Sequence, residues 1–182
     1  MGNRMRCSLL CEDVEQERFF RPILERVFGT RVNVEARKPA GGAPFVMAQL
    51  PRLVKGIRQR HQEAAGLIVV VDGDTLGLAA RINEINGYLA RAGMEGLRNV
   101  DKVAVCVPCR NIETWCLWFC NVRPLNEIDD FKSRWRKEAH KTREAADAWF
   151  APTAPAEVDA EKNTLPALSA ARAEINRVLK LV

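Results

Sequence analysis

Acidic residues follow two strand-like segments of the sequence. Glu12 comes directly after residues 6–11, and Asp72 and Asp74 come directly after the buried-type run 67–71. Ligands of open α/β sheets bind at the carboxyl ends of the strands, so we expect these acids to converge. Carboxylates that lie together repel unless a proton or a cation intervenes. Mg²⁺ suits such a place, because it binds one or two carboxylates together with phosphate oxygens.

A fourth acid, Glu113, lies just after another strand-like segment, 102–107, in the otherwise apolar segment 111–120. A carboxylate in such surroundings is costly to bury unless it is hydrogen bonded or near a cation. Convergent carboxylates suit metal-assisted attack on a phosphodiester, in which the metal polarises the phosphoryl oxygen and activates water. An ordinary polar turn is the alternative explanation of Asp-Gly-Asp at 72–74.

The net charge of +5 is concentrated in one segment. Residues 31–61 hold seven Lys or Arg and one acid, Glu35, whereas the rest of the chain is nearly balanced. A basic patch of this kind binds polyanions. A solvated helix face that binds nothing is the alternative, and charge alone slightly favours it. The candidate nucleic-acid contacts are Arg37, Lys38, Arg52, Lys55 and Arg58, of which the last three share one side of an expected helix over 46–62.

Four of the six cysteines lie close together in the sequence, at Cys106, Cys109, Cys116 and Cys120. The first two form a C-x-x-C motif, which raises a zinc or redox role. The pattern favours reduced, buried core thiols instead, because Cys106 lies in a strand pattern and the last two lie one turn apart on an apolar helix. Zinc binding by these cysteines stays open.

The chain has the composition of a globular protein, with 47% hydrophobic and 28% charged residues over 182 positions. This length predicts one domain. No apolar run approaches the ~20 residues of a membrane helix, and the N-terminal residues lack the apolar core of a signal peptide. We therefore expect a cytoplasmic protein without membrane contact.

Strand and helix patterns alternate along the chain, which predicts an α/β fold with a mostly parallel, Rossmann-like sheet, helices on both faces and additional C-terminal helices. We expect a single domain over 1–182, with a core of about 5–120 and a C-terminal helical extension of about 121–182. The expected strands are 6–11, 31–36, 67–71 and 102–107. The expected helices are about 15–28, 46–62, a segment with the stripe Leu78, Ile82, Ile85 and Leu89, then 111–120, 129–150 and 166–181, the last with the stripe Leu168, Ala171, Ile175 and Leu179. Pro51 is expected to interrupt the second helix early, and residues 151–155 read as a linker.

Residues 10–20, Leu-Cys-Glu-Asp-Val-Glu-Gln-Glu-Arg-Phe-Phe, and 68–74, Ile-Val-Val-Val-Asp-Gly-Asp, together resemble the Toprim domain. The shared features are a strand followed by Glu, a helix that opens with acids, and a strand that ends in Asp-x-Asp. Residues 112–117, Ile-Glu-Thr-Trp-Cys-Leu, are similar to a segment of small standalone Toprim-like proteins and of the nuclease domain of overcoming-lysogenization-defect proteins. The resemblance covers roughly residues 5–120.

This resemblance implies a Mg²⁺- or Mn²⁺-dependent nuclease, often one that acts in defence against phage. It implies that Glu12, Asp72 and Asp74 are metal ligands, with Glu113 as a further catalytic candidate. The chain departs from the family at Asp13, where a Gly is usual, and at Gln16, where an acid is usual. Either change leaves the competence of the site open. No spacing selects a family lysine among Lys132, Lys137 and Lys141.

Two other functions stay open. One is a non-catalytic module that binds nucleic acid or a partner protein through residues 31–61. The other is a receiver-like signalling domain with Glu12, Asp13 and Asp72 as its acids, although the spacing is long for a receiver and no Lys-Pro follows a fifth strand. The sequence does not select DNA or RNA, a partner protein or a homo-oligomer.

Overall fold

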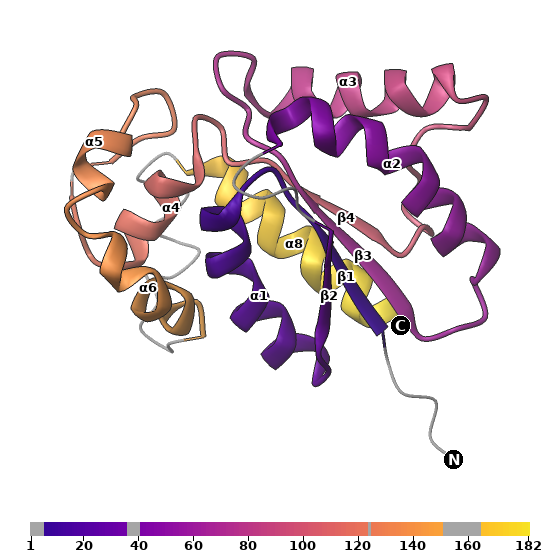
Figure 1. The fold of residues 1–182 in the computed structure, drawn as a ribbon, viewed down its shortest axis with the longest axis horizontal. Helices are drawn as coiled ribbons and strands as arrows, with labels where there is room; N and C mark the ends of the chain where they lie inside the picture. Colours follow the sequence, from indigo (N-terminus) through magenta and orange to yellow (C-terminus); the bar gives the residue numbers. More distant parts are fainter. Residues whose placement is uncertain (1–5, 36–40, 124, 151–164) are drawn as a thin grey trace.

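The computed structural model describes residues 6–35, 41–123, 125–150 and 165–182. The strands in these ranges form one parallel sheet with the order β2-β1-β3-β4 (Figure 1). They are β1 (Arg6–Leu10), β2 (Val32–Glu35), β3 (Ala65–Val70) and β4 (Val103–Cys106). The expected α/β class with a parallel sheet is confirmed, and each expected strand segment overlaps one of these strands, although β3 begins at Ala65, two residues before the expected 67–71.

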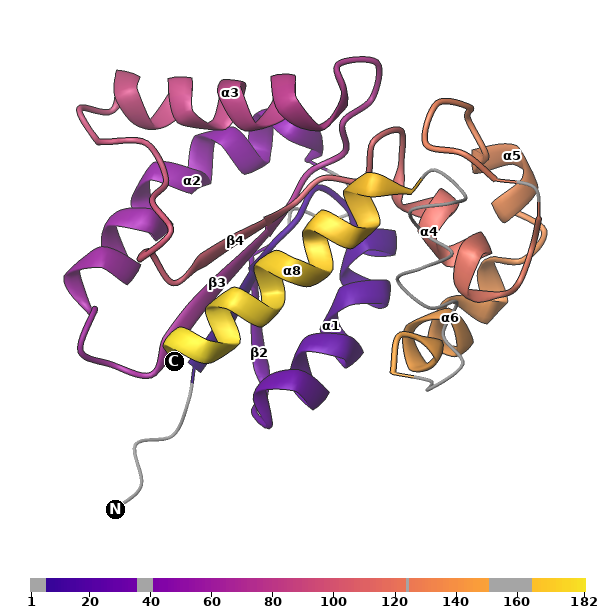
Figure 2. The same ribbon diagram turned by 180° about the vertical axis from the view of Figure 1, so that it is seen from behind.

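Helices cover both faces of the sheet (Figures 1 and 2). One face carries α2 and α3, the other carries α1 and α8, and α4, α5 and α6 group together beside α1. The helices are α1 (Val14–Phe28), α2 (Gly42–Gln59), α3 (Gly77–Arg91), α4 (Ile112–Phe119), α5 (Lys132–Trp135), the 3-10 turn η1 (Ala139–Lys141), α6 (Thr142–Ala148) and α8 (Pro166–Leu181). None of the described helices is both long and apolar enough to cross a membrane.

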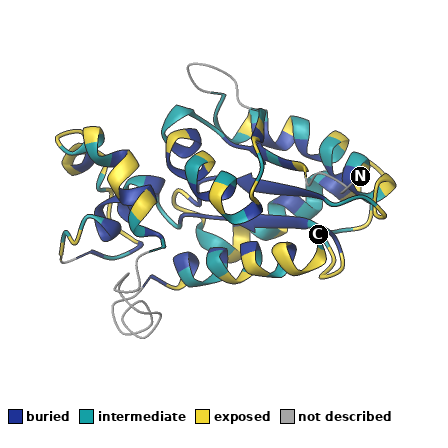
Figure 3. Cartoon of the chain, turned by 90° about the horizontal axis from the view of Figure 1, so that it is seen from below, coloured by how far each residue is buried: buried dark blue, intermediate teal, exposed yellow. Residues whose placement is uncertain are grey.

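The central strand β3 is buried along its whole length. Leu67 and Val69 face the core beneath α2 and α3, whereas Ile68 and Val70 face the core beneath α1 and α8. A strand with apolar residues on both faces needs helices on both sides. Figure 3 shows the result, with buried strands between helices whose outer sides are exposed.

Helix α1 begins directly after β1 and has a defined cap at each end. The side chain of Asp13 accepts hydrogen bonds from the backbone N–H groups of Glu15 and Gln16, at 3.0 and 2.9 Å. Gly29 ends the helix in the left-handed conformation, with φ of 60°. The cap at Asp13 fixes the first turn of α1 against the carboxyl end of β1, and Gln16 lies in this turn.

The expectation of one helix over 129–150 is wrong, because this segment forms α5, η1 and α6. A straight helix of that length would span roughly 30 Å. The chain turns instead, with Glu138 N–H bonded to the Trp135 carbonyl and Lys141 N–H bonded to the Glu138 carbonyl. These turns bring Trp135 and Trp149 into one apolar core.

Smaller differences concern α2 and α8. Helix α2 begins at Gly42 and runs through Pro51, so Pro51 does not interrupt it. In α8, Val178 is buried and Leu179 is 36% exposed, so Val178 takes the place expected for Leu179. The expected linker at 151–155 lies outside the described residues.

Candidate active site

The carboxyl ends of β1 and β3 bring Glu12 and Asp72 into contact. The two strands are parallel neighbours in which Leu10 pairs with Val69, so the residues that follow them meet at one edge of the sheet. The backbone N–H of Asp72 donates to Oε1 of Glu12 over 2.8 Å, across 60 residues of sequence. Asp72 is only 5% exposed. The strand ends therefore place two carboxylates together in a mostly buried position.

Gln16 connects these two residues from the first turn of α1. Its Nε2 donates to Oδ1 of Asp72 over 2.9 Å, and its Oε1 accepts from the backbone N–H of Glu12, also over 2.9 Å. Gln16 is completely buried. Because the N–H of Glu12 requires an acceptor, the amide of Gln16 is oriented with its donor toward Asp72.

Burial and mutual repulsion raise the pKa of both carboxyl groups. Burial raises the pKa of Glu12 to about 7 against the hydrogen bond from the Asp72 N–H, and the charge of Asp74 adds to this effect. Burial raises the pKa of Asp72 well above its ordinary value, and the charges of Glu12 and Glu113 raise it further. A site of this kind needs a proton or a cation before both carboxyl groups can be accommodated.

Asp74 lies at the rim of the site and is held by Arg81. The guanidinium of Arg81 donates to Oδ2 of Asp74 over 3.1 Å, to the Asp72 carbonyl over 2.8 Å and to Glu84 over 2.6 Å. Arg81 is buried, whereas the side chain of Asp74 is 58% exposed. Asp74 has a positive φ of 47°. Arg81 therefore holds the turn after β3, and Asp74 contacts Arg81 rather than Asp72.

Gly73 joins this turn to the end of β4. Its N–H donates to the Pro108 carbonyl over 2.7 Å. A Cβ atom at this position would lie 2.5 Å from the carbonyl oxygen of Cys109, which belongs to the backbone and cannot turn away. Only glycine permits this close approach of the two turns.

Glu113 lies in the first turn of α4. Its Oε2 is buried and has no hydrogen-bond partner among the described residues. Burial raises the pKa of Glu113, the charge of Lys132 opposes this, and the charges of Asp13 and Glu15 add to it. The charge of Glu113 also acts on the carboxyl group of Asp72, so Glu113 lies near this edge of the sheet.

The donor set fits a hard divalent cation. Carboxylate oxygens are the ligands that Mg²⁺ and Mn²⁺ prefer, and Mg²⁺ needs only one or two of them beside water and phosphate oxygens. The repulsion between Glu12 and Asp72 would be relieved by such an ion. Across the described ranges, however, no three His, Cys, Asp or Glu residues are gathered as a ready-made metal cluster. Glu12 and Asp72 are therefore the pair that would hold a cation.

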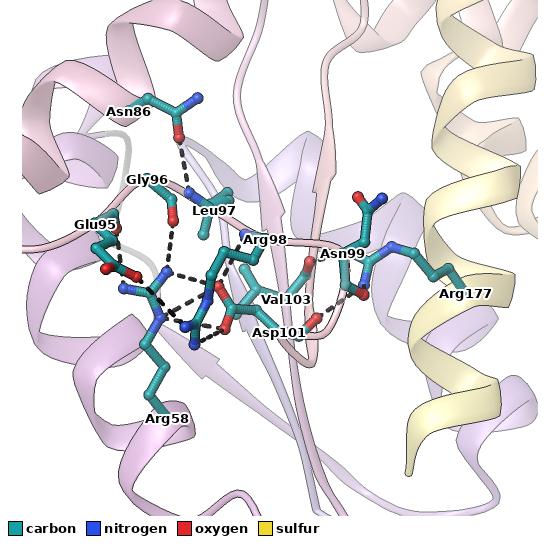
Figure 4. A network of polar contacts seen from close by, with 10 residues as sticks. All are labelled: Arg58, Asn86, Glu95, Gly96, Leu97, Arg98, Asn99, Asp101, Val103 and Arg177. Carbon is teal, nitrogen blue, oxygen red and sulfur yellow. Dashed lines mark hydrogen bonds and ion pairs between the residues drawn. The ribbon is translucent and has the colours of Figure 1, made fainter.

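The basic side chains predicted to form one surface on α2 do not share a common environment. Arg52 lies 3.5 Å from Glu35 Oε2, and Lys55 is exposed. Arg58 reaches into the loop before β4, where it pairs with Asp101 over 2.6 Å and donates to the carbonyls of Glu95 and Gly96 (Figure 4). Arg58 thus has a structural partner. The candidates Arg37 and Lys38 lie outside the described residues.

The cysteines belong mainly to the cores. All six are free, and Cys106 and Cys116 are buried in the core between the sheet, α1 and α8. Burial raises the pKa of both thiols. Within the part of the chain that the structure describes, they form no zinc cluster.

Sequence reasoning missed two buried polar roles. Gln16 follows Asp13 at the spacing of a capping box, which was the available signal for a side chain that turns back toward the start of α1. Glu127 accepts hydrogen bonds from Trp115 Nε1 and from the first N–H groups of α8, at Ala167 and Leu168. Glu127 lies outside any helix or strand, and its sequence context gave no signal for this role.

Comparisons with family models, curated proteins and solved structures gave no match. The function of the site is therefore inferred from its residues and their geometry.

Proposed function

We propose that this protein is a Mg²⁺- or Mn²⁺-dependent hydrolase of nucleic-acid phosphodiesters, with Glu12 and Asp72 as the cation ligands. The observation that carries the proposal is the partly buried contact between the Asp72 N–H and the carboxylate of Glu12, beside which the pKa of both carboxyl groups is raised. Two carboxylates held together in a poorly solvated place are costly for the fold. A divalent cation bound by both carboxylates would offset their repulsion, so the pair can serve as a cation-binding site.

Each carboxylate keeps one oxygen for a ligand. The Asp72 N–H occupies Oε1 of Glu12, and Gln16 occupies Oδ1 of Asp72. The second oxygen of each group accepts no hydrogen bond from another described residue. When bound here, the cation would polarise a phosphoryl oxygen and lower the pKa of water. Gln16 fixes the rotamer of Asp72, so the pair is pre-oriented.

Glu113 and Arg81 have different roles in this proposal. Glu113 has a raised pKa and an unpaired buried oxygen, which suits a group that takes up and releases a proton during hydrolysis. Arg81 is engaged with Asp72, Asp74 and Glu84, so it is a positioning residue for the turn and not a free phosphate ligand.

The resemblance to Toprim nucleases supports the same chemistry and extends the proposal to a role in phage defence. Gln16 stands where that family usually has an acid. This change, together with the lack of a three-residue metal cluster in the described ranges, favours one alternative function. The alternative is a Toprim-like module that binds nucleic acid without cleaving it.

Cleavage of labelled DNA and RNA in Mg²⁺ or Mn²⁺ distinguishes the two functions. The wild type is compared with Glu12→Gln and Asp72→Asn, and with Glu95→Gln as a control at an exposed carboxylate of the loop before β4. We expect both site variants to lose at least about 100-fold in rate and the control to keep it. Salt-sensitive binding by all four proteins without cleavage by any would replace the hydrolase with the binding module.

A further inference from the structure

A second basic segment lies at residues 132–143. Six of these twelve residues are Lys or Arg, and Glu138 is the only acid. The side chains that lie on α5 or directly after it are exposed. They are Lys132, Arg134, Arg136 and Lys137. This density of positive charge exceeds that of residues 31–61. It does not show in the net charge of the C-terminal half, because acidic residues elsewhere in that half compensate for it.

Both ends of this segment are attached to the rim of the carboxylate site. At one end, Asn111 at the start of α4 donates to Oδ1 of Asp130 over 3.0 Å. At the other end, the hydroxyl of Thr142 donates to the Ala139 carbonyl over 2.7 Å, and its oxygen lies 3.4 Å from Oε2 of Glu15, in the first turn of α1. Residues 131–141 thus span from the helix that carries Glu113 to the helix that begins beside Glu12.

The interior of the segment is fixed against the core. Trp135 on α5 is 2% exposed and packs in the same core as α1 and α4. The charge of Lys132 acts on the carboxyl group of Glu113. Figures 1 and 2 show α4, α5 and α6 grouped beside α1. The basic side chains are therefore presented by an anchored element next to the site.

Several of these cations have no internal partner. Arg134, Arg136 and Lys137 form no ion pair with another described residue, whereas Lys141 pairs with Glu138 and Arg143 with Asp147. On α2, Arg52 and Arg58 are already paired with acids. A cation without an internal ion pair can bind phosphate without breaking a contact, so α5 is better suited to a polyanion than α2.

A groove lies along α1 beside this basic surface. It has a volume of about 510 Å³ and lies between α1 and the η1–α6 segment. Its basic lining side chains come from both walls, and they are Arg18, Arg21, His140 and Arg143. Glu17 also lines this groove, and Arg18, Arg21 and Arg143 pair with Glu15, Glu17 and Asp147, so the arginines of the groove are already in ion pairs, unlike the cations of α5.

We infer that α5 and the residues directly after it form the surface that holds the phosphodiester backbone of a nucleic acid at the carboxylate site. The inference rests on the proposed function for its link to cleavage, but backbone binding is measured separately. A cluster of carboxylates repels a polyanion, so a nuclease site of this kind needs cations on a neighbouring element. Because phosphate contacts carry no sequence information, this surface binds without sequence preference.

The test is a salt-dependent binding titration. Fluorescence anisotropy with labelled duplex DNA, single-stranded DNA and RNA, in EDTA to prevent cleavage, compares two triple variants of equal charge. One is Arg134→Gln, Arg136→Gln and Lys137→Gln. The control is Arg52→Gln and Lys55→Gln on α2 together with Arg60→Gln directly after it, and thermal melting of both variants checks that each is folded.

We expect the α5 variant to bind at least about tenfold more weakly and the α2 variant to bind like the wild type. The dependence of log K on log salt should become shallower by about 2–3 for duplex DNA in the α5 variant. Equal binding by the α5 variant and the wild type, equal loss in both variants, or no binding by the wild type overturns the inference. If cleavage depends on Asp72 but not on the α5 side chains, the proposed hydrolase activity holds and the binding surface on α5 is refuted. If binding depends on α5 and no cleavage occurs, the binding surface holds and the proposed hydrolase activity is refuted.

Discussion

Gln16 donates a hydrogen bond from Nε2 to Oδ1 of Asp72 over 2.9 Å, and the same side chain accepts one from the Glu12 N–H. The two acids lie at the ends of different strands, so this amide links β1, α1 and β3 at one point. It also satisfies one oxygen of a buried carboxylate. The position that the Toprim resemblance assigns to an acid is thus occupied by a donor that holds another acid in place.

We expect Gln16→Leu to lower cleavage about 10–100-fold, because groups that orient metal ligands contribute on this scale. It should also lower the free energy of unfolding by about 1–3 kcal/mol, since the Glu12 N–H loses its acceptor. The Mn²⁺ concentration for half-maximal activity should rise, which a purely structural effect would not cause. Gln49→Leu on α2 is the control, and an unchanged Mn²⁺ dependence in Gln16→Leu would contradict a positioning role.

Asp72→Asn should stabilise the protein in EDTA at pH 8 while it abolishes cleavage. Burial and neighbouring carboxylates make the charged form of Asp72 unfavourable. Its removal should therefore raise the free energy of unfolding at pH 8. Urea unfolding of both proteins measures this difference. A variant less stable than the wild type at pH 8 would show that the charged form of Asp72 does not destabilise the folded protein.

The stability of the wild type in EDTA should fall as the pH rises from about 4.5 toward 7. The pKa of Glu12 is raised from 4.5 to about 7, so in this window the folded protein keeps a proton that the unfolded chain has released. The folded state binds more protons, and its stability therefore decreases with pH. Urea unfolding between pH 4.5 and 8 should show a shallower decrease for Glu12→Gln. Identical pH profiles for the two proteins would be inconsistent with a raised pKa at Glu12.

Arg58→Ala should lower the free energy of unfolding by roughly 3 kcal/mol, because it leaves the buried carboxylate of Asp101 without its main partner. Lys55→Ala, one turn earlier on α2, should change it by less than about 0.5 kcal/mol. Chemical denaturation compares the two. Equal effects would mean that Arg58 is not a structural residue.

Gly73→Ala should destabilise the protein by at least about 2 kcal/mol and impair the site, because the added Cβ would approach the Cys109 carbonyl within van der Waals distance. Gly87→Ala is the matched control. Gly87 lies in α3 with nothing within 4 Å of its Cβ position, so this change should stabilise the protein by about 0.5–1 kcal/mol. Thermal melting of both variants measures these changes in stability. A Gly73→Ala variant as stable as the wild type would contradict the close approach of the two turns.

The fold could be predicted from the sequence because local patterns decide it. The apolar run 67–71 predicted the central strand β3, and the helix expected over about 15–28 matches α1 to within one residue. The segment 129–150 was misread because its breaks depend on two tryptophans that pack into one distant core, which periodicity does not reveal.

The candidate site was predictable only in part. The meeting of Glu12 and Asp72 follows from the parallel topology of β1 and β3. The capture of Arg58 by Asp101, 43 residues away, depends on the path of the loop before β4. In the same way, the sequence did not show that Asp74 contacts Arg81 rather than Asp72. Which acid each of these arginines contacts depends on the tertiary structure, and sequence spacing alone does not determine it.

Binding of Mn²⁺ measured by electron paramagnetic resonance, without nucleic acid, tests the cation site at the ends of β1 and β3 most directly. The proteins to compare are the wild type, Glu12→Gln, Asp72→Asn and the control Glu95→Gln. We expect one bound Mn²⁺ in the wild type and the control, with weaker binding as the pH falls below 7, and its loss in both site variants. Equal Mn²⁺ binding by all four proteins, or none by the wild type up to millimolar metal, would contradict a divalent-cation site formed by Glu12 and Asp72.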